Sequence, residues 1–283
     1  QAEDGIRDSV ASRGLGDVYK RQHSKSPILH QFWLRQNKIK GFYIPLKVSD
    51  DDLEMTLRNL PKIGFSGVNV TVPHKESVMS FAKIKTERAS LIGSANTLTF
   101  LPEGGFKADN TDGYGFMKNL EEQAPVWDPK EAKVLILGAG GACRAVIGAL
   151  LESGVEKLHV TNRTQKRAKD LQVFFNSQIE LIEWSEKEEL LKNVNTVINA
   201  TTLGMVGSDE LQFSLSKANE NTTIVDLVYN PINTPLLVEA HKKGCHVVNG
   251  IGMLLNQAIP GFNEWYGVKP TITKELLNRV MSK

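Results

Sequence analysis

Apolar and polar positions along the chain repeat with two different periods, and the stretch GVNVTVPHKE shows the shorter period clearly. Three valines in it alternate with Asn69 and Thr71, which predicts a strand with one apolar and one polar face. Pro73 should end this strand, because proline offers no N–H to a sheet. Lys75 follows just past the strand end. Most such lysines are solvated surface charges, so the pattern alone gives Lys75 no role.

The rest of the first half divides into short helices and strands. The helical period and acidic or capped starts predict helices at 26–36, 50–60, 75–84 and 86–93, and one that begins near Asp112. Alternating residues predict further strands at 41–48, 95–100 and 104–110. Ser26 is expected to be the N-cap of the first helix, with Pro27 as its first helical residue.

The second half alternates more regularly, beyond a polar, proline-bearing connector at 124–133. Strands rich in Val, Ile and Leu are predicted at 133–140, 157–164, 179–184, 195–202 and 222–229, with a helix after each of the first three. This alternation indicates a parallel sheet with helices on both faces. The tail is predicted to be helical at 252–268 and 273–283.

The segment VLILGAGGACR carries the strongest local signal for a binding site. An apolar strand runs into a glycine-rich turn and then a helix, whose N-terminal N–H groups can receive a pyrophosphate. Gly138 and Gly140 fit the dinucleotide-binding pattern, whereas Cys143 stands where a third glycine or alanine is usual. The sequence therefore predicts a dinucleotide site, although glycines also serve ordinary turns.

The end of the next strand indicates which dinucleotide is bound. NAD-binding proteins generally place an acidic residue there for the ribose 2′-hydroxyl. This chain has Asn162, Arg163 and Thr164, followed by Arg167. Two guanidiniums and a hydroxyl suit a 2′-phosphate, so NADP is the predicted cofactor. The alternative is that both arginines are solvated residues at a helix start.

Composition favours an ordinary globular protein. The chain of 283 residues is long enough for two domains or one large one, and its 41% hydrophobic and 23% charged residues are ordinary for a globular protein with a real core. The net charge of +2 gives no basic field for nucleic acid or a membrane surface, and the apolar runs are too short to span a bilayer. The two cysteines form no disulfide or metal pattern, and the histidines lack metal-site spacing. We therefore expect no metal and a cytoplasmic location.

Several short motifs point to one family when they are taken together and in order. HSKSP, NVTVPHKE, GSANT, DNTDG, GAGGACR, NRT, NAT, DLVYNP and GMLLNQA resemble the shikimate dehydrogenase family, which reduces 3-dehydroshikimate with NADPH in aromatic amino-acid biosynthesis. The resemblance runs from about His23 to the C-terminus. It implies an α/β fold with a substrate-binding domain at 23–112, a Rossmann NADP-binding domain at 113–251, and C-terminal helices at 252–283 that pack on the first domain. Such an enzyme would be a monomer or homodimer.

The resemblance also implies roles for individual side chains. Lys75 and Asp112 would form the catalytic pair, in which the ammonium stabilises and protonates the alkoxide and the carboxylate orients the ammonium. Ser24 and Ser26 would hold the substrate carboxylate, with Thr71 and Tyr229 nearby. The ring oxygens of the substrate would bind Asn69, Asn96, Asp112 and Gln257. The pyrophosphate would lie on Gly138, Ala139, Gly140, Gly141 and Ala142, the adenosine phosphate on Asn162, Arg163, Thr164 and Arg167, and the nicotinamide half near Thr201, Gly250 and Met253.

The chain departs from the family pattern before HSKSP. An apolar strand and a turn are usual there, whereas residues 1–22 mix glycine, serine and charges of both signs with little periodicity. We expect these residues to be foreign to the family, and the first strand of the substrate sheet to be missing or replaced by the short stretch at 17–19. Two other functions stay open. One is a quinate/shikimate dehydrogenase that uses NAD, and the other is a non-catalytic shikimate-binding protein on the same fold.

Overall fold

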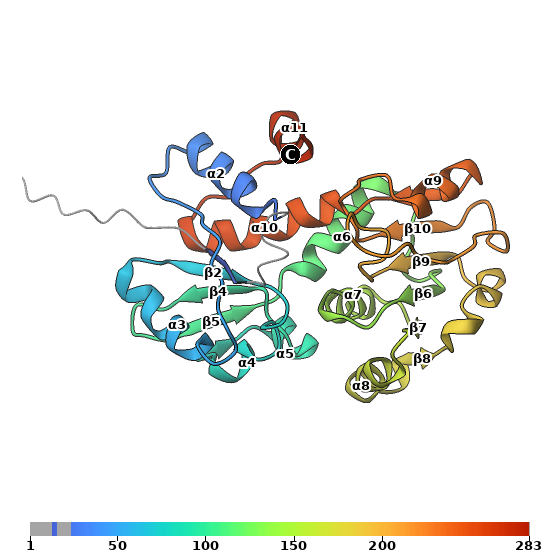
Figure 1. The fold of residues 1–283 in the computed structure, drawn as a ribbon, viewed down its shortest axis with the longest axis horizontal. Coiled ribbons are helices and arrows are strands. Elements are labelled where there is room, and N and C mark those ends of the chain that lie inside the picture. Colours follow the sequence, from blue (N-terminus) through green and yellow to red (C-terminus); the bar gives the residue numbers. More distant parts are fainter. Residues whose placement is uncertain (1–12, 16–23, 283) are drawn as a thin grey trace, which may run out of the picture. The chain divides into compact units, whose positions relative to one another are not determined.

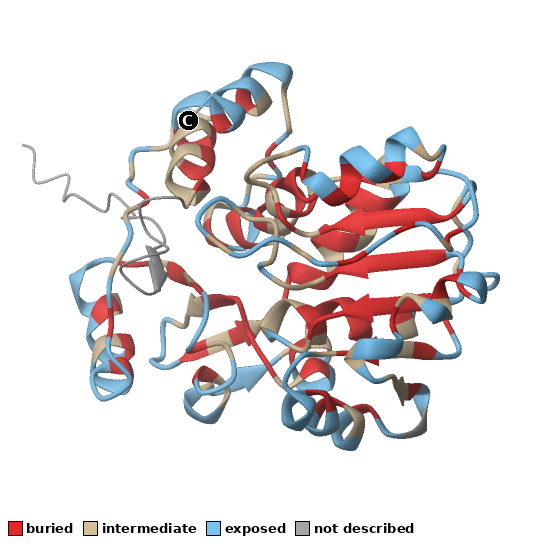
Figure 2. Ribbon diagram, turned by 45° about the vertical axis from the view of Figure 1, so that its right-hand side comes forward, coloured by how far each residue is buried: buried red, intermediate tan, exposed pale blue. Residues whose placement is uncertain are grey.

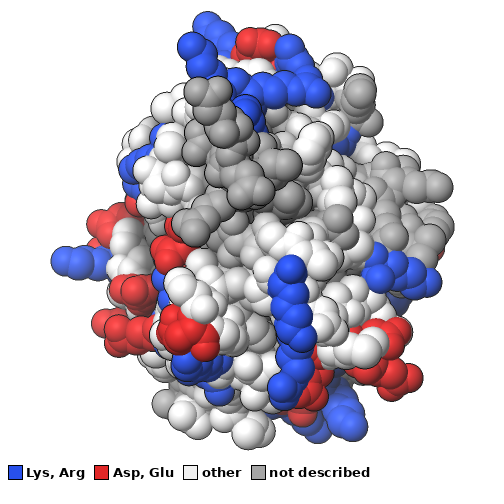
Figure 3. All heavy atoms as spheres, turned by 90° about the vertical axis from the view of Figure 1, so that its left-hand side faces the viewer, with Lys and Arg blue, Asp and Glu red and all other residues white. Residues whose placement is uncertain are grey.

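The computed structural model describes residues 13–15 and 24–282, which divide into two compact units (Figure 1). Unit 1 comprises Gln1–Thr111 and Ala258–Lys283, and unit 2 comprises Asp112–Gln257. In the described ranges, every helix is too short or too polar to cross a membrane. On the face drawn in Figure 3, lysines and arginines lie interspersed with acidic side chains, in keeping with the small net charge of +2.

Unit 2 is built on a six-stranded parallel sheet with the order β11-β10-β9-β6-β7-β8. Its strands are β6 (Val134–Leu137), β7 (Leu158–Thr161), β8 (Ile179–Leu181), β9 (Thr196–Asn199), β10 (Thr223–Asp226) and β11 (His246–Val248). The chain winds outward from β6 in one direction and then, from β9, in the other. This is the doubly wound order of dinucleotide-binding domains, whose ligands bind where the direction reverses. The predicted parallel sheet is therefore confirmed.

Helices cover both faces of this sheet. They are α6 (Asp112–Gln123), α7 (Gly141–Glu152), α8 (Gln165–Phe175), α9 (Pro235–Lys242) and the first part of α10 (Ile251–Tyr266). Alternate residues of β6 serve the two faces: Val134 and Ile136 join the core with α7, whereas Leu135 and Leu137 join the core with α9. The central strands β6, β9 and β10 are buried along their length, which explains why they read as continuous apolar runs (Figure 2).

Glycines let α6 approach α10 closely within unit 2. A Cβ on Gly115 would lie 2.6 Å from the backbone oxygen of Met253, and one on Gly252 would lie 1.8 Å from Oδ1 of Asn119. Both contacts are far shorter than van der Waals distance. A side chain at position 115 would meet the backbone of α10, and one at position 252 would force the Asn119 side chain to move. The Asn119 amide nitrogen also donates to the backbone oxygen of Asn249 at 2.7 Å, which fixes the start of α10 against α6.

Unit 1 contains a five-stranded mixed sheet with the order β1-β2-β4-β5-β3. The strands are β1 (Arg13–Leu15), β2 (Gly67–Val70), β3 (Ile84–Lys85), β4 (Thr97–Phe100) and β5 (Phe106–Asp109). The helices are α2 (Ser26–Gln36), α3 (Leu53–Asn59), α4 (Val78–Phe81), α5 (Glu87–Ile92) and α11 (Lys274–Met281). The indole N–H of Trp33 donates to the backbone oxygen of Thr271 at 2.9 Å, and α11 packs on α2. The prediction that the C-terminal helices return to the first domain is confirmed.

The prediction of a missing first strand is wrong. Arg13–Leu15 forms β1, which pairs in parallel with β2 at the edge of the sheet and places Gly14 opposite Asn69. The expected replacement at 17–19, and most of the segment 1–22, lies outside the described residues. Edge strands can be short because only one side of them is paired, so an apolar run is a poor guide to their position.

Other elements also differ from the sequence pattern. No strand forms at 41–48, where only Leu46 makes an isolated bridge; Pro45 lacks the N–H that a ladder needs. The helix expected after β8 is a pair of short 3₁₀ turns, Trp184–Glu186 and Glu189–Lys192. Three further elements were not predicted: α9, β11 and the two-residue β3, which ends a stretch expected to be helical at 75–84. The Thr234 side chain caps α9 by accepting the N–H of Leu237. β2 ends at Val70, before Pro73.

His30 is a buried titratable residue in unit 1 whose ring has no hydrogen-bond partner among the described residues. Its ring stacks on Tyr43, with centroids 4.2 Å apart and planes within 6° of parallel, and neither ring nitrogen bonds to a described residue. The rings of Trp33, Phe262 and Trp265 surround it, with centroids 5.8 to 6.0 Å from that of His30. Burial lowers the pKa of His30 from 6.5 to about 3. The imidazole must therefore stay neutral in the folded state.

The His30→Phe variant should be less sensitive to acid than the unmodified protein. Because the unfolded chain takes up a proton near pH 6.5 and the folded chain only near pH 3, stability is full above pH 6.5 and falls as the pH drops toward 3. The loss should reach about 2 kcal/mol at pH 5, from about 1.4 kcal/mol per pH unit. Urea unfolding at pH 7.5 and 5.0 measures it, with the exposed His246→Gln as control. An equal loss in His30→Phe would show that another group causes the acid sensitivity.

Candidate active site

Asn69 on β2 is held in one orientation by its neighbours in unit 1. Its amide nitrogen donates to the backbone oxygen of Asn96 and to the hydroxyl of Thr97, both at 3.2 Å. Its Oδ1 accepts from the Tyr43 hydroxyl at 3.0 Å. Both N–H groups are therefore used inside the protein, and Oδ1 has one partner among the described residues, which leaves it one acceptor site. Burial raises the pKa of Tyr43, partly offset by a hydrogen bond with Ser26, so its hydroxyl stays protonated as the donor.

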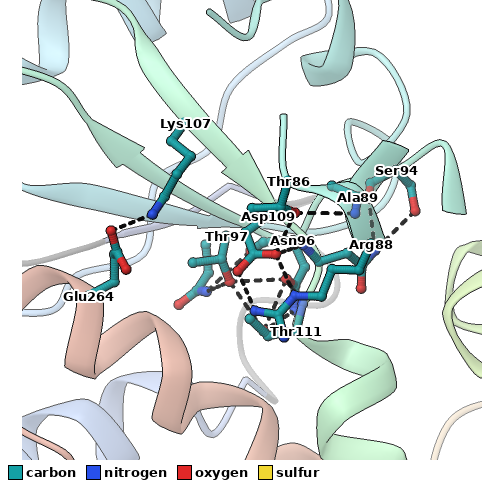
Figure 4. Close-up of polar contacts among 12 residues, drawn as sticks. Thr86, Arg88, Ala89, Ser94, Asn96, Thr97, Lys107, Asp109, Thr111 and Glu264 are labelled. Atoms are coloured by element: carbon teal, nitrogen blue, oxygen red, sulfur yellow. Dashed lines mark hydrogen bonds and ion pairs between the residues drawn. The ribbon is translucent and has the colours of Figure 1, made fainter. Parts of the chain in front are cut away.

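Asn96 lies in a buried polar cluster between β4 and the segment after β5 (Figure 4). Its Oδ1 accepts from the backbone N–H of Thr111 at 2.8 Å and from the Thr97 hydroxyl at 3.0 Å. Its amide nitrogen donates to the Thr111 hydroxyl at 3.0 Å. The motifs GSANT and DNTDG, which lie on either side of the hairpin formed by β4 and β5, thus meet in one hydrogen-bonded cluster. Asp112 follows directly on Thr111.

Arg88 and Asp109 anchor this cluster from the side (Figure 4). Asp109 ends β5, and its carboxylate accepts from the Arg88 guanidinium in a two-pronged ion pair, with Nε at 2.6 Å. It also accepts from the Thr86 hydroxyl and the Asn110 backbone N–H, each at 2.8 Å. Burial alone would raise the pKa of Asp109, but the hydrogen bond and charge of Arg88 hold it below its usual value. These residues were not identified from the sequence, where nothing in their spacing reveals the pairing.

Lys75 and Asp112 occupy the positions expected of residues at element ends. Lys75 is half-buried in the turn between β2 and α4, and its backbone oxygen accepts from Ala95 at 2.8 Å. Asp112 is buried and is the first residue of α6, where the helix dipole favours a carboxylate. Lys75 belongs to unit 1 and Asp112 to unit 2, so their pairing stays a prediction.

The remaining predicted substrate residues are distributed over both units. Ser24 and Ser26 are half-buried at the start of α2, and Thr71 is exposed after β2. The prediction that Ser26 caps α2 is wrong: Lys25 is the N-cap residue and makes no side-chain cap bond. The Ser26 hydroxyl instead forms the hydrogen bond with Tyr43 described above. In unit 2, Tyr229 is half-buried after β10, where burial raises its pKa, and Gln257 lies in α10.

The glycine turn between β6 and α7 fits a dinucleotide. Gly138 has φ +114°, and a Cβ there would lie 2.9 Å from Cγ2 of Thr201, so only glycine suits this position. A Cβ on Gly140, the N-cap of α7, would meet nothing within 4 Å, which leaves the space beside the helix N-terminus open. Cys143, which stands where the dinucleotide-binding pattern usually has glycine or alanine, lies in the core. Its side chain is 0% exposed, and burial raises the pKa of its thiol to about 12. Cysteine serves there as a small apolar residue.

The residues after β7 fit a phosphate on the adenosine ribose. Arg163 and Arg167 are exposed, and neither forms an ion pair with a side chain in the described part of the chain. Thr164 is the N-cap of α8 without a side-chain cap bond, and the Asn162 amide nitrogen donates to its backbone oxygen at 2.8 Å. Two cationic groups and a hydroxyl therefore stand at the end of β7.

The predicted nicotinamide-side residues follow the carboxyl ends of β9 and β11. Thr201 follows β9, and Gly250 and Met253 stand before and inside the first turns of α10. Gly250 and Met253 are buried. A Cβ on Gly250 would lie 2.4 Å from the backbone oxygen of Leu227, so this glycine is fixed by packing. Asn199 is an additional residue here, which the motif NAT contains but to which sequence reasoning gave no role.

Two family models match the chain. The shikimate dehydrogenase substrate binding domain matches residues 19–98, and the shikimate / quinate 5-dehydrogenase model matches residues 120–243. The chain is 50% identical over 251 residues to shikimate dehydrogenase (NADP(+)) of Roseobacter denitrificans, which covers 89% of this chain and 91% of the relative. The protein of the same name from Ruegeria sp. is 46% identical over 259 residues, 92% of this chain and 94% of the relative.

Solved structures have the same fold. Quinate dehydrogenase from Corynebacterium glutamicum in complex with NAD gives a TM-score of 0.88 at 28% identity, covering 98% of this chain and 100% of that one. Shikimate 5-dehydrogenase from Thermus thermophilus in complex with NADP(H) and shikimate gives 0.83 at 32% identity, covering 96% and 98%. The resemblance predicted from the motifs, and the predicted fold class, are thereby confirmed. The chain belongs to the shikimate dehydrogenase family.

Proposed function

We propose that this protein is an NADP-dependent shikimate dehydrogenase, which reversibly reduces 3-dehydroshikimate to shikimate in aromatic amino-acid biosynthesis. The observation that carries this proposal is the 50% identity, over 91% of its length, to a relative with that name. The arrangement of the site supports it independently. Residues around Asn69 and Asn96 in unit 1 suit a polyhydroxylated substrate, and the glycine turn of unit 2 suits the cofactor.

The substrate ring would be held mainly by amides and the carboxylate by hydroxyls. Oδ1 of Asn69 has one acceptor site left and can accept an O–H of the ring. Asn96, Asp112 and Gln257 would bind the other ring oxygens. The hydroxyls of Ser24, Ser26, Thr71 and Tyr229 would donate to the substrate carboxylate, and Tyr229 can do so because its raised pKa keeps it protonated.

The proposed chemistry needs only one acid and one orienting base from the chain. NADPH supplies the hydride that reduces the carbonyl carbon. The Lys75 ammonium then stabilises the negative charge that develops on the carbonyl oxygen and donates a proton to it. The Asp112 carboxylate, at the N-terminus of α6, would orient the ammonium toward that oxygen. In the reverse direction, neutral Lys75 accepts the proton of the shikimate hydroxyl.

The cofactor would lie along the carboxyl edge of the unit 2 sheet. Gly138, Ala139, Gly140, Gly141 and Ala142 would place backbone N–H groups of the turn and of α7 against the pyrophosphate. Asn162, Arg163, Thr164 and Arg167 would hold the 2′-phosphate, and Thr201, Gly250 and Met253 the nicotinamide half. All the proposed cofactor residues thus belong to unit 2, whereas the proposed substrate residues belong to both units. The two free, buried cysteines support a reducing, cytoplasmic location. The enzyme would act as a monomer or a homodimer.

A second candidate function is an NAD-dependent quinate/shikimate dehydrogenase, because one structural neighbour is a quinate dehydrogenase with NAD. The end of β7 argues against it, since arginines stand where an acidic residue would bind the ribose 2′-hydroxyl. A non-catalytic binding protein is less well supported, because both Lys75 and Asp112 are retained.

One assay distinguishes these functions. Oxidation of shikimate and of quinate by the purified protein is followed at the absorbance of reduced nicotinamide, with NADP and with NAD. We expect shikimate with NADP to give the highest kcat/KM. Faster oxidation with NAD would favour the quinate/shikimate enzyme. Shikimate binding by calorimetry without turnover in any combination would favour the non-catalytic protein.

A further inference from the structure

A row of hydrogen-bonded polar side chains lies at the carboxyl edge of the unit 2 sheet: Thr234, Asp226, Asn199 and Thr201. Asn199 ends β9 and Asp226 ends β10, and they are register partners on neighbouring parallel strands. They are 0% and 1% exposed. The Asn199 amide nitrogen donates to Oδ1 of Asp226 at 2.9 Å. Burying an amide and a carboxylate costs free energy unless both are hydrogen-bonded, so the partners of these two side chains indicate what the pair does.

Backbone N–H groups fix which atom donates and which accepts in these side-chain hydrogen bonds. The backbone N–H of Val228 donates to Oδ1 of Asp226 at 3.0 Å, so this oxygen is an acceptor whatever the protonation of the other. The Thr234 hydroxyl bonds Oδ2 at 2.6 Å. Burial raises the pKa of Asp226, and the bonds from Thr234, Val228 and Asn199 oppose the rise. Asn199 must therefore turn its N–H₂ group, and not its oxygen, toward Asp226.

The other end of the Asn199 amide then faces Thr201. Its Oδ1 accepts the backbone N–H of Thr201 at 3.1 Å, which independently fixes the same amide orientation. It also accepts the Thr201 hydroxyl proton at 2.7 Å. The second amide N–H of Asn199 donates to the backbone oxygen of Leu203 at 3.2 Å. Every donor of this amide is satisfied, so the arrangement has no alternative flip.

This arrangement decides what the Thr201 hydroxyl can offer. A hydroxyl has one proton and two lone pairs, and its proton is used by Asn199. One lone pair takes the backbone N–H of Leu203 at 3.0 Å. With respect to the residues that the structure describes, the half-buried Thr201 keeps one acceptor site, and its Cγ2 packs against the turn at Gly138.

We propose that Asn199 and Asp226 are positioning residues that fix the Thr201 hydroxyl as a hydrogen-bond acceptor toward the bound dinucleotide. The inference rests on the proposed function, in which Thr201 lies near the nicotinamide half. The Thr201 oxygen can then bind only a hydrogen-bond donor of the ligand, and not a phosphate or carbonyl oxygen. Two donors of this half share that chemistry, the carboxamide N–H and the ribose O–H. Analogues with an altered pyridine substituent lack the carboxamide N–H but keep the ribose O–H.

Dinucleotide affinity of Thr201 variants tests the proposal. Thr201→Val keeps the shape and removes the hydroxyl, and it should weaken NADP binding about three- to tenfold, the size of one neutral hydrogen bond. Thr201→Ser should restore most of the affinity. Calorimetric titration with NADP gives the dissociation constants without turnover. The control is Thr222→Val, because the buried Thr222 hydroxyl has no partner among the described residues. Unchanged affinity in Thr201→Val, or equal weakening in Thr201→Ser, would overturn the proposal.

A double-mutant cycle tests the positioning by Asn199. Asn199→Leu frees the Thr201 proton to point at the ligand, so it should weaken NADP binding as much as Thr201→Val. The double variant should be no weaker than either single variant, because all three lose the same hydrogen bond. Additive losses would contradict the positioning role. If Asn199→Leu does not fold, as judged by thermal unfolding, the Thr201 series alone still decides whether the hydroxyl accepts a bond.

An analogue separates the two donors. In the 3-acetylpyridine analogue of NADP a methyl ketone replaces the carboxamide, so no N–H remains on the ring. If the donor is the carboxamide, Thr201→Val should bind this analogue as well as the unmodified protein does. If the donor is the ribose, the three- to tenfold loss should persist. A wild-type protein that binds NADP but does not oxidise shikimate would overturn the proposed function and leave this inference intact.

Discussion

Lys75→Ala should lower kcat for shikimate oxidation by at least about 10²- to 10⁴-fold, with a smaller change in KM. The reason is that the ammonium acts on the charge of the transition state, whereas several other groups hold the substrate. Steady-state kinetics with varied shikimate at saturating NADP separate kcat from KM. The matched control is Lys85→Ala, which removes an exposed lysine of the same unit and should leave both constants unchanged.

The pairing of Lys75 with Asp112 adds a second measurement. Asp112→Asn keeps the shape of the side chain and removes the charge that orients the ammonium, so kcat should fall here as well. The losses of the two single variants should not add in the double variant, because both groups act on one transition state. Should Lys75→Ala raise only KM, the lysine binds substrate and the acid must be sought elsewhere.

Removing both Arg163 and Arg167 should weaken NADP binding about a hundredfold or more and leave NAD binding nearly unchanged. Only NADP carries the 2′-phosphate, and hydrogen bonds to charged groups contribute roughly 1.5–3 kcal/mol each. Dissociation constants for both cofactors, measured by calorimetry with the double alanine variant, give the comparison. The exposed Lys169→Ala on the same helix α8 is the control for a general loss of positive charge. Similar losses for both cofactors would assign the arginines a structural role.

The parallel sheet of unit 2 was predictable because its strands are buried on both faces. β6, β9 and β10 read as continuous apolar runs, and the glycine turn follows directly in the sequence. Edge elements gave weaker signals. β11 has only three residues, with an exposed first position, and β1 lies in a segment of mixed composition.

The motif residues of the site could be named from the sequence, but the hydrogen bonds among them could not. Asn199 meets Asp226 because of the strand register, and Asp109 meets Arg88 because β5 ends beside α5. Such pairings depend on how strands and helices are arranged in space, and no spacing in one chain encodes them. The same reason accounts for Tyr43: it lies in a segment predicted as a strand, and only packing brings its hydroxyl to Asn69.

The burial of Cys143 makes the protein's own thiols reporters of its opening. The chain has two cysteines, both buried, and burial raises the pKa of each thiol. Thiol reagents attack the thiolate, so the folded protein should react slowly, at a rate set by how often each site opens. Cys143 lies in the first turn of α7, directly under the glycine turn. A dinucleotide bound at this turn, as proposed, would oppose that opening, so the labelling rate of Cys143 would measure how tightly the ligand holds the helix to its sheet.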